Sequence, residues 1–248
     1  GWVGQEVARA ALEDSRVSLV GIADVDPVKS GRDLGEIIGE GRIGLGIDGN
    51  VRNMLLRIRP EVVVLATTSR ITDLVPDLLA CAECGTHIVT TCENLADLES
   101  ALPLLPKDLV SRIEDAKIVV VATGVNPGFA MDRLPVTIAQ ATRNIRRVRV
   151  VRTVDASKRR AQLQAKIGVG MDPLDFVTAL ESGKAGHAGL SCSLRLVARG
   201  LGIVLDKTSE TCAPLVAEDD MPSVLGTVAR GSVKGVYQVA RGYRQRQE

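Results

Sequence analysis

Residues 118–129, Ile-Val-Val-Val-Ala-Thr-Gly-Val-Asn-Pro-Gly-Phe, join an apolar run to a loop built from Gly, Asn and Pro. An uninterrupted run of β-branched residues bounded by turn residues is typical of a strand that is buried on both faces of a parallel sheet. Such a strand delivers the following loop to the carboxyl edge of the sheet, where open α/β folds bind ligands. The stretch therefore predicts a parallel α/β sheet with a ligand site around residues 126–129.

Similar apolar runs occur earlier in the chain, and they alternate with segments of helical periodicity. The predicted strands are 17–23, 61–66, 87–91 and 118–122, and the helices between or before them are 1–12, 34–38, 51–58, 71–84 and 106–115. This alternation indicates crossover helices and a parallel sheet. We expect a Rossmann-type doubly wound α/β domain over residues 1–125.

The pattern changes after residue 125. Helices are predicted at 131–142, 172–182 and 190–201, a long strand with interleaved Arg and Val at 144–155, and β-branched pieces punctuated by glycine from 206 onward. We interpret residues 126–248 as a second, α+β domain that binds substrate and supports dimerisation.

The composition excludes several classes of protein. Aromatic residues make up 2% of the 248 residues and the net charge is +1, so neither stacking platforms nor the basic surface of a nucleic-acid binder is expected. No apolar run approaches the roughly 20 residues that a membrane span needs. Five cysteines, an odd number, favour reduced thiols and a cytoplasmic location.

The start of the chain carries part of a dinucleotide-binding fingerprint. Gly1 and Gly4 fit the second and third glycines of G-x-G-x-x-G, and Asp24 follows at the spacing of the acid that binds ribose hydroxyls. The first glycine and the strand before it are not in the sequence, so we expect an N-terminally truncated domain that lacks its first strand. A helix that simply begins with glycines is the alternative. The predicted cofactor contacts here are Gly1, Trp2, Val3, Gly4 and Asp24.

The acid at Asp24 favours NAD, because a carboxylate repels the 2′-phosphate of NADP. Lys29 and Arg32 lie close enough in sequence to accommodate that phosphate, so both cofactors stay open.

Polar residues end two further predicted strands on the same edge of the sheet. Thr67, Thr68 and Ser69 follow one strand and could hydrogen-bond the cofactor, although capping of the next helix is the alternative. Glu93 follows the other, where a carboxylate can bind an ammonium group or accept a proton.

Cys81, Cys84, His87 and Cys92 form a C-x2-C-x2-H-x4-C run that suggests zinc. Small buried side chains that pack a strand and a helix account for it better, so no metal site is expected.

Three motifs carry a resemblance to a known family: A-T-G-V-N-P-G-F-A-M-D at 122–132, D-A-S-K-R-R at 155–160 with K-I-G at 166–168, and G-H-A-G at 186–189. The chain resembles the 2,4-diaminopentanoate dehydrogenase group of the dihydrodipicolinate-reductase-like oxidoreductases over nearly its whole length. Members of that group are longer at both ends, so the chain resembles an internal fragment that is also incomplete at its C-terminus.

The resemblance implies NAD(P)-dependent oxidative deamination of a small amine or amino acid, and we expect a homo-oligomer, a dimer. It suggests Glu93, Asp132 and Asp155 as partners of the substrate's ammonium groups, and Arg152, Lys158 or Arg159 as partners of its carboxylate. His187 and Lys158 join Glu93 as candidate catalytic residues, while Asn126, Pro127 and Gly128 are expected beside the nicotinamide or the substrate. These residues also have purely structural explanations. Asp132 could lie in the first turn of a helix, and residues 158–160 could be a charged loop exposed to solvent.

Three other functions are compatible with parts of the sequence. The paired histidines and the D-A-P-S-G-T segment of dihydrodipicolinate reductase proper are absent, which disfavours reduction of a cyclic imine. A non-catalytic dinucleotide-binding protein and a methyltransferase also place a glycine-rich turn near a strand-end acid. Cofactor titration and substitution of Glu93 and His187 separate these possibilities.

Overall fold

The computed structural model describes residues 1–186 and 189–245. It contains two compact units, Gly1–Gly124 and Val125–Glu248. Within the described ranges no helix is both long enough and apolar enough to cross a membrane.

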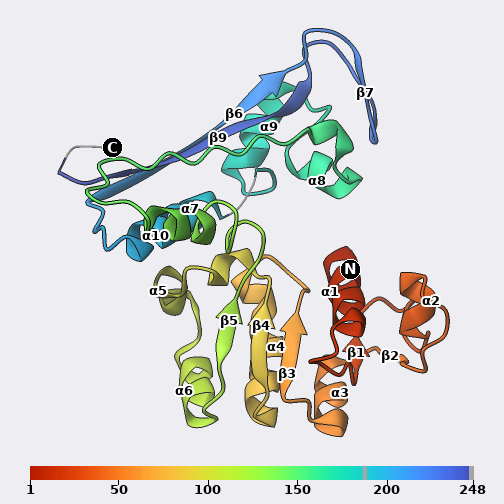
Figure 1. Cartoon of the computed structure of the whole chain (residues 1–248). Helices are drawn as coiled ribbons and strands as arrows, with labels where there is room; N and C mark the ends of the chain where they lie inside the picture. Colours follow the sequence, from red (N-terminus) through yellow and green to blue (C-terminus); the bar gives the residue numbers. More distant parts are fainter. Residues whose placement is uncertain (187–188, 246–248) are drawn as a thin grey trace. The chain divides into compact units, whose positions relative to one another are not determined.

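The first unit is built on parallel strands. β3 (Val62–Leu65), β4 (His87–Thr90) and β5 (Val120–Ala122) form one sheet in the order β3-β4-β5, and β1 (Ile22–Ala23) pairs with β2 (Ile47–Asp48) in another. Figure 1 shows β3, β4 and β5 running side by side in the same direction. The predicted parallel α/β architecture is confirmed, with strands shorter than the sequence indicated.

Helices connect these strands. They are α1 (Trp2–Glu13), α2 (Leu34–Ile38), α3 (Val51–Ile58), α4 (Ile71–Cys84), α5 (Leu98–Ala101) and α6 (Lys107–Asp115), with short 3-10 helices η1 (Glu93–Leu95) and η2 (Leu102–Leu104). α4 ends where the sequence predicts, because Gly85 adopts φ +67° and its N–H caps the last turn through Ala82 O.

Two separate cores stabilise this unit. The larger one packs α3, α4 and α6 against the three-stranded sheet, with Leu74, Leu78, Ile88 and Leu109 each at most 1% exposed. The smaller one lies around β2 and consists of Ala8, Leu34, Ile38 and Ile47. Since burial of such side chains supplies about 1.5–3 kcal/mol each, the larger core dominates the stability of the unit.

The second unit is an antiparallel ribbon with helices at its sides. β6 (Lys207–Val216) pairs with β9 (Val233–Tyr243), and β7 (Met221–Ser223) pairs with β8 (Gly226–Val228). The helices are α7 (Arg133–Ala139), α8 (Ala161–Lys166), α9 (Pro173–Glu181) and α10 (Leu190–Gly200), with η3 (Ala156–Lys158). α10 contacts both ribbon strands and α9 contacts β6 (Figure 1).

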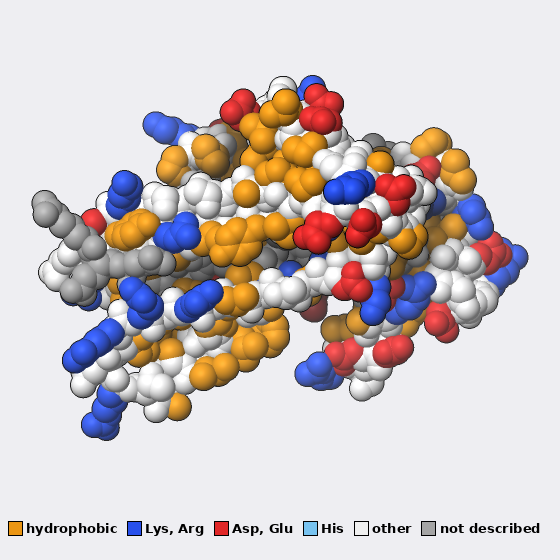
Figure 2. Space-filling model, turned by 90° about the horizontal axis from the view of Figure 1, so that it is seen from above, with side chains coloured by type: hydrophobic (Ala, Val, Ile, Leu, Met, Phe, Trp, Pro, Cys, Tyr) orange, Lys and Arg blue, Asp and Glu red, His pale blue; other side chains and the backbone are white. Residues whose placement is uncertain are grey.

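The predicted strand at 144–155 is wrong. Residues 144–154 belong to no helix or strand, and no backbone hydrogen bond joins them to another described residue. A strand requires a partner, and β6 and β9 pair only with each other in the described ranges. Val148, Val151 and Val154 are consequently exposed. Figure 2 shows hydrophobic side chains lying among Lys and Arg on one face of the molecule.

Candidate functional site

Thr90, at the end of β4, ties the ends of two strands together. Its buried hydroxyl donates to Leu65 O (3.0 Å) and accepts from Cys92 N (3.1 Å), and Cys92 Sγ in turn donates to Ser69 O (3.3 Å). Glu93 begins η1 directly after this network and is half-buried. The strand ends therefore fix the backbone from which the Glu93 carboxylate projects.

The polar run after β3 makes contacts other than helix capping. Thr67 Oγ1 donates to Asp77 Oδ2 (3.4 Å), and Thr68 Oγ1 accepts from Arg70 N (3.1 Å). The N-cap of α4 is Arg70, which makes no side-chain cap bond. Burial raises the pKa of Asp77, although the Thr67 hydroxyl opposes the rise. Thr67, Thr68 and Ser69 stay predicted cofactor contacts.

The start of α1 lies against the acid that follows β1. The Gly1 ammonium is 3.0 Å from Asp24 Oδ2, Lys29 Nζ is 2.8 Å from the same oxygen, and Asp26 N donates to Oδ1. Burial opposes ionisation of Asp24, but these hydrogen bonds outweigh it and lower its pKa to about 2. Trp2 and Val3 are exposed on the first turn, and Gly1 and Gly4 have open space around them. The helix start and the acid are thus adjacent, as a dinucleotide site requires.

The Asn126-Pro127-Gly128 loop is held by Asp132 and Ser193. Asp132 Oδ2 accepts from Gly128 N (2.8 Å) and from Ser193 Oγ (2.7 Å), and Oδ1 accepts from Arg133 N (2.7 Å). Asp132 is 1% and Ser193 2% exposed, while Asn126 is half-buried and its Oδ1 lies 3.1 Å from Ser193 Oγ. Asp132 therefore caps α7 and anchors the loop; direct contact with substrate stays a prediction.

The D-A-S-K-R-R segment forms the short helix η3. Asp155 caps it through Ser157 N (3.0 Å), and hydrogen bonds from Ser157 lower the pKa of this exposed carboxylate. Lys158 is largely exposed and lies 3.7 Å from Asp155. Arg152 is exposed on the segment before it. Asp155 and Lys158, predicted separately, are thus neighbours.

Gln164 is a residue that sequence reasoning missed. It is fully buried, and its Nε2 donates to Ser157 O (3.0 Å) and Arg159 O (2.9 Å). It fixes the backbone of the basic segment from inside the unit. No local sequence signal marks such a residue, because a glutamine in a helix is usually exposed.

The cysteine and histidine run is distributed over structural positions. Cys81 is fully buried in α4, and burial raises the pKa of its thiol to about 12, which disfavours the thiolate that zinc requires. His87 Nδ1 accepts from Val119 N (2.9 Å). His187, the predicted acid–base group, lies outside the described residues.

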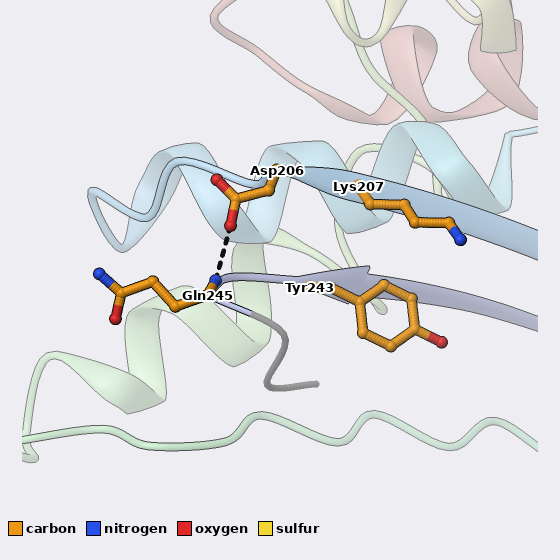
Figure 3. Close-up of a pocket in the computed structure, with 4 residues that line it drawn as sticks. All are labelled: Asp206, Lys207, Tyr243 and Gln245. Carbon is orange, nitrogen blue, oxygen red and sulfur yellow. Dashed lines mark hydrogen bonds between the residues drawn. The ribbon is translucent and has the colours of Figure 1, made fainter.

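A surface hollow of ≈ 460 Å³ is lined by Asp206, Lys207, Tyr243 and Gln245 at one end of the β6–β9 ribbon. In Figure 3 the Asp206 carboxylate points toward Gln245, and Asp206 Oδ2 accepts a hydrogen bond from the backbone N–H of Gln245 (2.6 Å). None of the predicted site residues lines it, so we assign it no role in the chemistry.

Comparison with known proteins decides the family. Residues 129–248 match the 2,4-diaminopentanoate dehydrogenase C-terminal domain. These residues belong to that family. The resemblance expected from the sequence motifs is therefore confirmed.

Individual relatives agree with this assignment. The chain is 23% identical to 2,4-diaminopentanoate dehydrogenase of Acetoanaerobium sticklandii, over 90% of this chain and 68% of that protein. It is 26% identical to an amine dehydrogenase of Streptomyces virginiae, over 85% of this chain and 60% of the relative. The structure of an amine dehydrogenase from Mycobacterium smegmatis superposes with a TM-score of 0.80 at 22% identity, covering 98% of this chain and 72% of the other, which establishes a shared fold.

Proposed function

We propose that the chain belongs to an NAD(P)-dependent dehydrogenase that removes the amino group from a small amine or amino acid. The observation that carries the proposal is the match of residues 129–248 to the diaminopentanoate dehydrogenase domain, supported by similarity to two amine-oxidising enzymes over most of the chain. In the balanced reaction, the protonated amine, oxidised NAD(P) and one water give a carbonyl compound, ammonium, reduced NAD(P) and one proton. The amine carbon loses its hydride to the nicotinamide, and water supplies the carbonyl oxygen.

The first unit offers residues suited to the cofactor. The start of α1 supplies backbone N–H groups and the positive end of a helix dipole, which suit a pyrophosphate, and Asp24 beside it is an acceptor for ribose hydroxyls. When bound, the nicotinamide accepts the hydride from the amine carbon. We propose NAD as the preferred cofactor, because the Asp24 carboxylate repels a 2′-phosphate. Lys29 neutralises part of the charge on Asp24, so we expect NADP to be tolerated.

Glu93 is the residue that we propose takes the ammonium proton, since a free amine must form before the hydride leaves. It sits on the rigid strand-end network of Thr90 and Cys92, which suits a general base that must hold its position. Lys158 and Arg159 supply positive charge for a substrate carboxylate, and Gln164 keeps their backbone in place. His187 and Asp155 remain candidates for proton transfer and ammonium binding.

The test compares Glu93→Gln with Glu99→Gln, a matched change on the exposed start of α5. The protein is incubated with 2,4-diaminopentanoate and short amines, and reduced nicotinamide is followed by absorbance. We expect Glu93→Gln to lower kcat by about 10²–10⁴-fold with dinucleotide affinity unchanged, and Glu99→Gln to behave as wild type. Dinucleotide binding without turnover of any short amine or amino acid would instead identify a non-catalytic binding protein.

A further inference from the structure

Within the second unit, Ser193 joins the Asn126-Pro127-Gly128 loop to the buried carboxylate of Asp132. Its hydroxyl oxygen lies 2.7 Å from Asp132 Oδ2 and 3.1 Å from Asn126 Oδ1. These contacts bridge 61 and 67 residues of sequence, so they exist only in the folded unit. The contacts make Ser193 the link through which Asp132 can influence Asn126.

One proton cannot serve both neighbours. A serine hydroxyl has a single proton to donate and two lone pairs to accept with. Asp132 is the nearer neighbour and the one that bears charge, and charge-assisted hydrogen bonds are about twice as strong as neutral ones. The other two donors at Asp132, Gly128 N and Arg133 N, are backbone N–H groups that require an acceptor there. The Ser193 proton therefore goes to Asp132.

The orientation of the Asn126 amide follows. Ser193 turns lone pairs toward Asn126, so the amide must present its nitrogen to Ser193 as a donor, with its oxygen turned away. The structure places Asn126 Oδ1 against Ser193. The oxygen and nitrogen of an asparagine amide have nearly the same shape and are assigned from the hydrogen-bond network, so exchanging the two atoms gives Ser193 the donor that this network requires. With Asp132 and Ser193 both buried, water cannot relieve the opposite orientation, which would place two acceptors against one proton.

We propose that Ser193 and Asp132 are positioning residues that fix the Asn126 amide so that its oxygen accepts an N–H from the ligand. The inference rests on the proposed function for the identity of that ligand. Two N–H donors fit this acceptor, the carboxamide of the nicotinamide and the ammonium of the substrate, and both present the same chemistry to Asn126.

The orientation is tested directly in the wild-type protein by NMR, with Asn126 assigned among the five asparagines of the chain. We expect nuclear Overhauser contacts between the Asn126 side-chain amide protons and the Ser193 β-protons, because the amide nitrogen faces the hydroxyl. Absence of these contacts, with the amide signals otherwise assigned, overturns the inference. This result does not depend on any enzymatic activity, so it stands even if the proposed function fails.

The role in binding is tested with Ser193→Ala and the matched Ser191→Ala, which lies on the same helix but bonds Glu210. Affinities are measured for NADH and for its 3-acetylpyridine analogue, which lacks the carboxamide N–H. Loss of one hydrogen bond weakens binding affinity by about 2- to 12-fold. If the cofactor is the donor, Ser193→Ala reduces the preference for NADH over the analogue by that factor. If the substrate is the donor, KM rises by that factor and the preference is unchanged.

Ser193→Thr keeps the hydroxyl and is expected to restore wild-type values. The inference is overturned if Ser193→Ala folds, as judged by its thermal melt, yet changes neither the cofactor preference nor KM, or if Ser191→Ala changes them equally. A wild-type protein that binds no dinucleotide contradicts the proposed function and leaves the NMR result to decide the orientation.

Discussion

Around Asp24, a few charges determine how the first unit responds to acid. The pKa of about 2 lies below the ordinary value of 3.8, so the folded state holds the ionised form more strongly than the unfolded state does. The resulting stability is present above pH about 4 and is lost as the pH falls toward 2. We expect Asp24→Asn to lower the free energy of unfolding by about 1 kcal/mol at pH 7, after allowing for solvent screening, and by progressively less as the pH falls through 2.

Urea unfolding of the two proteins at a series of pH values measures this difference. Asp108→Asn is the control, because Asp108 lies on the exposed side of α6 at 4.0 Å from Arg112 and such surface pairs contribute little. A difference between Asp24→Asn and wild type that stays constant from pH 7 to pH 2 would show that ionisation of Asp24 is not its source.

The buried thiols make a second prediction about single residues. Burial raises the pKa of Cys81 to about 12 and also raises that of Cys92, so the reactive thiolate is scarce at either position at pH 8. We expect iodoacetamide to label both far more slowly in the native protein than after unfolding in urea, as read by peptide mass spectrometry. Fast native labelling of Cys81 would contradict its place in the core and reopen the zinc interpretation.

Residue types at strand ends could be anticipated from the sequence, but their partners could not. Asp24 and Glu93 could be predicted to lie at strand ends because an acid shortly after an apolar run is a local pattern. Thr90 and Ser193 were missed, since their importance lies in contacts 25 and 61 residues away along the chain. Long-range hydrogen bonds of this kind leave no periodicity in the sequence.

At the scale of the elements, a helix or strand can be predicted from sequence when the residues that determine it lie within the element itself. α4 was predicted with its correct ends because helical spacing and a terminal glycine are both local signals. The strand expected at 144–155 was wrong because strand formation depends on a partner that lies elsewhere. The alternation of Arg and Val in this segment is compatible with a β-strand, but the local sequence does not determine whether a partner strand is present.

Gln164 gives a prediction about the basic segment of η3. Its Nε2 holds the carbonyl groups of Ser157 and Arg159, so Gln164→Ala should free a backbone that contains Lys158 and Arg159. We expect faster trypsin cleavage at these two residues and a free energy of unfolding lower by about 1–3 kcal/mol. Gln162→Ala, an exposed change on the same helix, is the control. Equal cleavage rates in both variants would show that Gln164 does not hold the segment.

The turn after α8 gives a prediction about packing between elements. Gly168 and Gly170 both have positive φ, +75° and +86°, so alanine strains either backbone. A Cβ at Gly168 would lie 2.3 Å from the Phe176 ring of α9, whereas one at Gly170 would meet open space. We expect Gly168→Ala to cost about 1–3 kcal/mol more than Gly170→Ala in urea unfolding. Equal costs would mean that Phe176 can move aside.

At the scale of the whole molecule, the hydrophobic cores are unequal. The core around β3, β4 and β5 contains 16 buried residues and the one around β2 contains four, whereas the cluster of Val169, Ala217 and Val228 among the described residues of the second unit contains three. The β6–β9 ribbon has exposed side chains along most of β6, and a two-stranded ribbon is marginally stable without cover. Stability should therefore differ strongly among regions of one chain.

Hydrogen exchange measured by mass spectrometry tests this difference. Peptides from β4 should exchange most slowly, because β4 is hydrogen-bonded to a strand on each side. Peptides from β1 and β2 should exchange faster than those from β4. Peptides from β6 should also exchange faster than those from β4, although β6 is the longer strand. Residues 144–154 should exchange fastest, because their amides have no backbone partner within the described ranges. If β6 and 144–154 are instead protected, and protection increases with protein concentration, a second copy of the chain covers them. That outcome would support the expected dimer and supply the partner that the Arg and Val alternation of 144–155 lacks.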